Sequence, residues 1–84
     1  MYKVVYYQKV TIGTEVFENE YHGGDEFRLR RTALHYVLDI VQSEYKEDGY
    51  GTETRVGGIF CYKSEKTEKK ERKFKEVLIK VEKV

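Results

Sequence analysis

The segment Tyr2–Val10 constrains the fold more than any other part of the sequence. β-Branched and aromatic side chains occupy both faces of an extended chain here, with Val4 and Tyr6 on one face and Val5 and Tyr7 on the other. This pattern is typical of a strand that is covered on both sides or lies at an interface. We therefore predict a strand over Tyr2–Val10.

The next elements are expected to be a hairpin and a long helix. Ile12-Gly13 is a turn signal, and apolar and polar residues alternate over Thr14–Tyr21, which predicts a second strand. The acidic string Gly23–Phe27 then favours a helix start, with Asp25 as the capping residue. Helical spacing of apolar residues continues to Tyr45, and Gly49 is the expected left-handed residue after the helix.

Two further strands complete the predicted fold. Arg55–Lys63 is expected to be a strand in which Gly57-Gly58 marks a bulge or a close approach of another backbone. The segment Lys73–Val84 fits either a helix or a strand, and its β-branched alternation favours the strand. The resulting order is ββαββ, an α+β fold in two layers with one long helix packed on an antiparallel four-stranded sheet.

The length and the cysteine content limit the fold further. A chain of 84 residues fits one small α+β domain, residues 1–84, whose core is small enough to profit from cover by a partner. The single cysteine, Cys61, excludes an intramolecular disulfide and favours a reducing compartment. No apolar run long enough for a signal peptide or a membrane span is present, so we expect a cytoplasmic protein without membrane contact.

The string Gly23-Gly24-Asp25-Glu26-Phe27 spells the GGDEF signature and resembles diguanylate cyclases over these residues alone. The resemblance implies metal-bound carboxylates, and in that family a further metal-binding aspartate lies on an earlier strand. The residues before Gly23 contain no aspartate. We therefore interpret Asp25 as a helix cap.

Catalytic residue patterns are otherwise sparse. His22 and His35 are separated by the expected boundary between loop and helix, and no serine has an evident general base beside it. We predict a protein that is not an enzyme and that needs no cofactor and no metal.

Charge is unevenly distributed although the net charge is only +1. The segment Thr14–Glu26 carries five acidic residues and no lysine or arginine, whereas Lys63–Glu76 carries seven basic residues and four glutamates. The two segments are either neighbours in the fold, independent solvated surfaces, or complementary halves of a contact between two copies of the chain.

Eight tyrosines exceed what so small a core can bury, and tyrosine is enriched in protein interfaces. We therefore expect a non-catalytic interaction module that binds another macromolecule, most simply a protein, and that forms a homo-oligomer. The alternative is a nucleic-acid-binding domain that uses the Arg28–Arg31 cluster and the Lys66–Lys73 loop.

The loop over Ser64–Lys73 looks longer than a tight hairpin requires, and long charged loops tend to carry function. We predict that it contacts the partner. The candidate partner-binding residues are Lys66, Lys69, Lys70, Arg72, Lys73, Arg28, Arg30, Arg31, Tyr6 and Tyr7.

Overall fold

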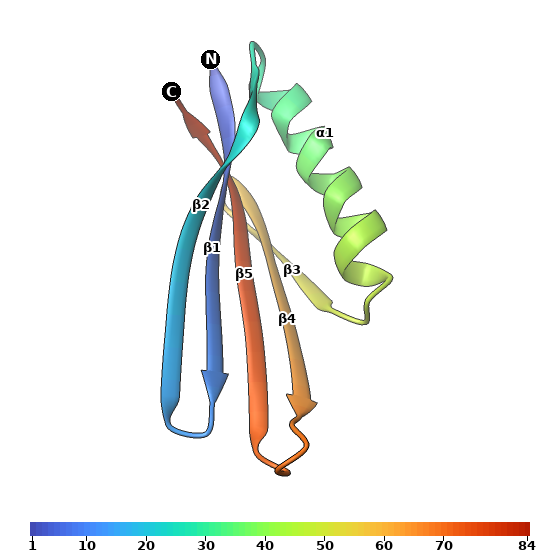
Figure 1. The fold of residues 1–84 in the computed structure, drawn as a ribbon. Helices are drawn as coiled ribbons and strands as arrows, with labels where there is room; N and C mark the ends of the chain where they lie inside the picture. The colour runs from blue at the N-terminus through green and yellow to red at the C-terminus, as the bar shows by residue number, and fades with distance from the viewer.

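The computed structural model describes all residues from Met1 to Val84 and contains five strands and one long helix (Figure 1). The strands are β1 (Tyr2–Ile12), β2 (Glu15–Phe27), β3 (Gly51–Arg55), β4 (Gly58–Lys66) and β5 (Arg72–Lys83). The helix is α1 (Arg30–Ile40), which widens into the π-helical segment η1 (Val41–Lys46). All strands pair antiparallel in the order β2-β1-β5-β4-β3.

The fold is therefore α+β, with one helix packed on an antiparallel sheet, but the sheet has five strands and the predicted number of four is wrong. The error lies at Gly57. Its φ of 75° is in the left-handed region and turns the chain between Arg55 and Gly58, which face each other as a hairpin pair. What the sequence suggested as one bulged strand, Arg55–Lys63, is two strands with a turn between them.

The predicted helix start at Gly23–Phe27 is also wrong. These residues continue β2, and Phe27 pairs with Tyr2 at the beginning of β1. The β1–β2 register shifts between Lys3 and Val5, so the glycines lie in a bulge and β2 runs on past it. The helix begins at Arg30, and its N-cap residue, Leu29, makes no side-chain capping bond, so Asp25 does not cap it.

Other turn and strand predictions are confirmed. Gly13 has a φ of 59° in the two-residue turn between β1 and β2, and Gly49 has a φ of 87° after the helical segment. The ambiguous C-terminal segment is the strand β5. The expected long loop Ser64–Lys73 is corrected to a short turn over residues 67–71, because β4 extends to Lys66 and β5 begins at Arg72.

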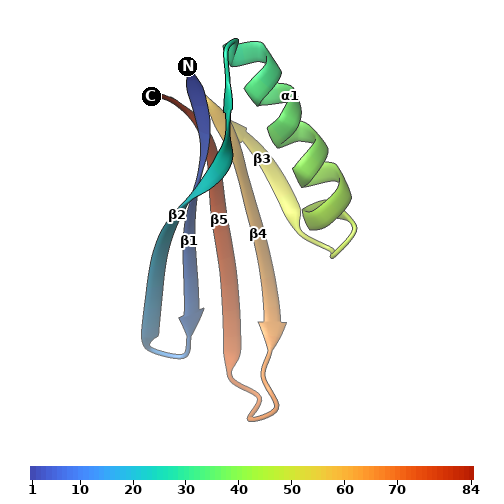
Figure 2. The same ribbon diagram turned by 45° about the horizontal axis from the view of Figure 1, so that its top comes forward.

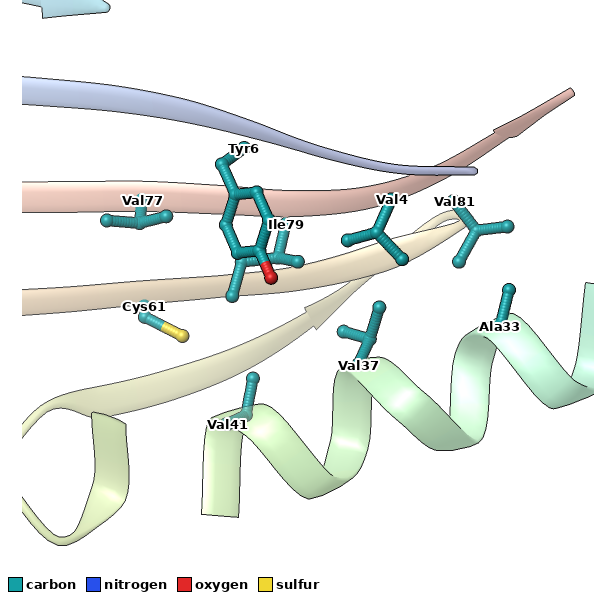
Figure 3. Close-up of a cluster of buried hydrophobic side chains, with 9 residues drawn as sticks. All are labelled: Val4, Tyr6, Ala33, Val37, Val41, Cys61, Val77, Ile79 and Val81. Atoms are coloured by element: carbon teal, nitrogen blue, oxygen red, sulfur yellow. The ribbon is translucent and has the colours of Figure 1, made fainter. Parts of the chain in front are cut away.

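The core lies between α1–η1 and one face of the sheet (Figure 3). Ala33, Val37 and Val41 follow each other at helical spacing of four and point toward the strands. The strands contribute side chains that alternate along β1, β4 and β5. These strand residues are Val4, Tyr6, Cys61, Val77, Ile79 and Val81.

The buried stripe of the helix is narrower than its apolar sequence suggests. Leu34, Ile40 and Tyr45 are half-buried against the core, whereas Leu29 and Leu38 are exposed. The fully buried line of Ala33, Val37 and Val41, flanked by these half-buried side chains, covers the part of the sheet beneath it.

The helix covers only part of one sheet face. The molecule measures 46 × 22 × 21 Å along its principal axes, and Figures 1 and 2 show α1 and β3 beside one end while the other four strands extend beyond them. We call residues 8–12, 15–20, 62–66 and 72–76 the open half of the sheet. These residues lie past the last core positions of β1, β4 and β5, or beside them on β2, and have no helix over either face.

Two glycines test the packing of the sheet. A Cβ atom on Gly58 would overlap the carbonyl oxygen of Ile79 and lie 2.9 Å from Cα of Lys80, whereas a Cβ on Gly24 would meet nothing within 4 Å. We expect Gly58→Ala to lower the free energy of unfolding by about 2–3 kcal/mol, because two backbones must move apart. Gly24→Ala should change it by less than about 0.5 kcal/mol. Urea unfolding of both variants gives the comparison, and equal midpoints would contradict the β4–β5 packing.

Candidate functional site

The sheet face opposite the helix carries a group of large apolar side chains. Side chains alternate between faces along a strand, and the register places Tyr7, Leu78 and Phe60 in one row across β1, β5 and β4. Tyr62 and Phe74 lie on the same face, further along β4 and β5. We call these five residues the aromatic face.

Two members of the aromatic face are strongly exposed: Tyr62 by 46% and Phe74 by 38%. Together with Phe60 and Glu76 they line a shallow hollow of about 240 Å³ between β4 and β5. Large apolar side chains around a shallow hollow on a sheet face without a helical cover are typical of a surface that another molecule covers.

The rings on β4 are held in place by their neighbours. The Phe60 and Tyr62 ring centroids are 5.8 Å apart with an interplanar angle of 28°. The Arg55 guanidinium lies 5.0 Å from the Phe60 centroid, and its Nη1 donates to Oε1 of Glu53 at 2.6 Å. These contacts fix the ring of Phe60 before any partner binds.

Tyr62 depends on a glycine in the adjacent strand. It pairs with Gly51, and a Cβ at Gly51 would come within 2.6 Å of the tyrosine ring. The aromatic ring therefore lies over the glycine, an arrangement that shields a glycine in a strand. Any larger residue at position 51 would displace the Tyr62 ring.

Tyr7 is fixed by a hydrogen bond along the sheet. Its hydroxyl donates to Oε2 of Glu82, although Tyr7 pairs with Leu78 and Glu82 pairs with Lys3. The Tyr7 side chain must therefore extend past the position of Val5 on the same face, and Val5 is fully buried. The hydrogen bond, followed by desolvation and the nearby negative charge, raises the pKa of Tyr7 to about 12.

The other side of the open half is charged. Lys75 Nζ lies 3.1 Å and Lys63 Nζ 3.4 Å from Oε1 of Glu65, and Lys63 also lies 3.6 Å from Asp48. These contacts lower the pKa of Glu65, chiefly through the hydrogen bond from Lys75, and raise the pKa of Lys75. The two faces of the open half thus differ: one carries the exposed rings of Tyr62 and Phe74, and the other carries an ion-pair network.

The two predicted basic groups lie at opposite ends of the molecule. Arg28 precedes α1, and Arg30 and Arg31 form its first turn, whereas the second group surrounds the β4–β5 turn (Figure 1). The second group comprises Lys66, Lys69, Lys70, Arg72 and Lys73, none of which forms an ion pair. The structure therefore does not bring the two groups together.

The two predicted tyrosines also have different positions. Tyr6 belongs to the core with 7% of its surface exposed, and its ring stacks on Tyr21 with centroids 4.5 Å apart. Burial first, and then nearby Tyr36, raises the pKa of Tyr6 to about 12. Tyr7 lies on the aromatic face. Of the aromatic face, the predicted site residues included Tyr7 alone. They missed Phe60 and Tyr62 on β4 and Phe74 and Leu78 on β5, although the two-residue alternation of Phe74 and Leu78 against Val77 and Ile79 could have placed them on the face opposite the core.

Neither sequence nor structure comparisons identify relatives. Searches against protein-family models, curated proteins and solved structures found no significant match. No helix is long and apolar enough to cross a membrane. No three side chains among His, Cys, Asp and Glu are grouped so that they could hold a metal ion.

Glu82→Ala tests the hydrogen bond of Tyr7. The Tyr7 hydroxyl should ionise near pH 12 in the wild type and at a lower pH in the variant, because the hydrogen bond to Glu82 is the largest cause of the raised pKa. Because the unfolded chain loses this proton near pH 10, the contribution to stability is complete below pH 10 and is lost as the pH rises through about 12. The Cζ chemical shift of Tyr7 followed by NMR measures the ionisation directly. Identical Tyr7 titrations in the two proteins would contradict the contact.

Proposed function

We propose that this chain is a non-catalytic module that binds another protein through the aromatic face. The observation that carries the proposal is the pair of exposed rings, Tyr62 and Phe74, around a shallow hollow on a sheet face that no helix covers. Tyrosine and phenylalanine are enriched at the centres of protein interfaces because they add contact area at little cost in conformational entropy.

The surroundings of the rings support the same function. Phe60 is already fixed by Arg55 and Tyr62, and the Tyr7 side chain is held by Glu82, so binding would immobilise few additional side chains. Charged residues border the aromatic residues, among them Lys9, Glu76 and Lys80, which alternate onto the same face. An apolar centre with a charged border is the usual composition of a protein interface.

A nucleic-acid partner is the second candidate function. The observation that favours it is the group of five cationic side chains around the β4–β5 turn, all without an ion-pair partner. Glu68 and Glu71 lie in the same turn and would repel phosphates. The Arg28–Arg31 cluster lies at the other end of the molecule and adds nothing to this surface.

Site-specific crosslinking in cells of the source organism tests the protein-binding proposal. A photoreactive amino acid at Ser64, which faces the same side as Phe74, should give a crosslinked protein band. The same amino acid at Gln42, exposed on the helical layer, should not give one. The mass of the product distinguishes a second copy of the chain, as the expected homo-oligomer requires, from a different protein.

The aromatic residues are then removed in the crosslinking variant. Tyr62→Ala combined with Phe74→Ala should weaken binding at least about 30-fold, because one truncated interface anchor costs about 2 kcal/mol. Circular dichroism checks that this protein remains folded. Crosslinking that persists in the double variant, or that is equal from Gln42, contradicts the proposal, and a product that nuclease removes supports the nucleic-acid alternative.

A further inference from the structure

The strand β2 forms a long open edge of the sheet. It pairs with β1 on one side and with no strand on the other, and residues 15–22 are all exposed. The opposite edge is β3, which has only five residues. An edge strand presents unpaired N–H and C=O groups that can accept a further strand, and short edges reduce that tendency. The edge of β2 is therefore the longer of the two templates.

The direction of its backbone groups follows from the register. The N–H of Gly13 donates to the carbonyl oxygen of Arg72 at 3.2 Å. Every second residue of a strand directs its N–H and C=O groups to the same side, so the odd-numbered residues of β1, such as Lys9, direct these groups toward β5. The intervening residues of β1 bond to β2. Glu18, which lies opposite Lys9, consequently directs its N–H and C=O groups away from the sheet.

The same alternation applies to Val16 and Glu20, whereas Phe17 and Asn19 bond to β1. The outward side of the edge therefore offers the backbone groups of Val16, Glu18 and Glu20. The side chains of Phe17 and Tyr21 lie on the helix side of the sheet, and those of Glu18 and Glu20 lie on the side of the aromatic face.

Charge determines which strand fits this edge. Residues 15–22 contain neither lysine nor proline, the usual protections of an edge, but they contain three exposed glutamates. Antiparallel pairing of two copies centred on Asn19 would place Glu18 opposite the other copy's Glu20, and centring on Glu18 would place that residue opposite itself. Like charges in directly opposed positions destabilise a sheet. In these two registers the edge disfavours a second copy, whereas Glu18 and Glu20 favour a basic strand.

We propose that the edge of β2 between Glu15 and His22 binds an extended basic segment of a partner protein as an additional strand. The fitting segment carries lysine or arginine at every second position, opposite Glu18 and Glu20, with apolar residues between them that contact Phe17 and Tyr21. Main-chain hydrogen bonds hold such a strand and the alternating side chains select it. This edge is a different surface from the aromatic face, and the inference does not depend on the function proposed for that face.

A synthetic peptide in which lysine alternates with valine tests this inference by NMR on the whole chain. Binding should slow the hydrogen exchange of the Val16, Glu18 and Glu20 amides, and a peptide in which glutamate replaces lysine should not bind. Binding elsewhere on the chain, or equal binding of both peptides, overturns the inference. Protection of the same amides at high protein concentration without peptide would show that a second copy occupies the edge and would overturn it too.

Variants of Glu18 separate the contribution of the backbone hydrogen bond to peptide binding from that of the side-chain charge. Glu18→Pro removes an N–H that points away from the sheet, so the chain should still fold and bind the lysine peptide at least about tenfold more weakly. Glu18→Gln retains the N–H and should lose less. If the proline variant does not fold, Glu18→Lys with Glu20→Lys replaces it and should reverse the preference toward the glutamate peptide. Unchanged affinity for the lysine peptide in the folded proline variant or in the lysine variant overturns the inference.

The aromatic face serves as the control for independence. Tyr62→Ala combined with Phe74→Ala should bind the lysine peptide as the wild type does, since neither side chain lies on β2. Loss of peptide binding in this variant would place the peptide on the aromatic face and overturn the edge proposal.

Discussion

Ala33, Val37 and Val41 press a single line of small side chains against the sheet, and the rest of the structure depends on this contact. Small residues let the helix approach closely and exclude water from Val4 and Ile79 beneath it. Because the line spans only two helical turns, the core it seals is short. The strands, however, are much longer than the core, so only one end of the sheet has a helical layer.

This mismatch divides the molecule into a stabilising end and an open half. At the stabilising end, apolar burial holds the helix and the central strands together. In the open half, strand pairing and ion pairs such as Lys75–Glu65 hold the chain, and Tyr62 and Phe74 project from one face. Exposed rings and an unpaired edge are costly features for a small protein to keep. Our two protein-binding proposals, for the aromatic face and for the edge of β2, would account for both.

Local sequence patterns correctly predicted strands that pair with their neighbours in the sequence. They gave wrong predictions where pairing with residues far away in the sequence determines the local conformation. The alternation of Tyr2–Val10 and the turn at Gly13 were sufficient for the first hairpin. The string Gly23–Phe27 has the composition of a helix start, but pairing with the first residues of β1 keeps it extended. Gly57 fits either a bulge or a turn, and only the pairing of Arg55 with Gly58 across it decides between them. For the same reason the sequence did not group the five residues of the aromatic face, because that grouping requires the register of β4 against β5.

Native-state hydrogen exchange along β5 tests the division most directly, because this central strand runs through both halves. The amide of Ile79, whose side chain lies in the core, should exchange only through global unfolding. The amide of Phe74, in the open half, should exchange through local opening at a free energy at least about 1 kcal/mol lower. Equal free energies at the two positions would show that the open half is as stable as the core and would contradict this account.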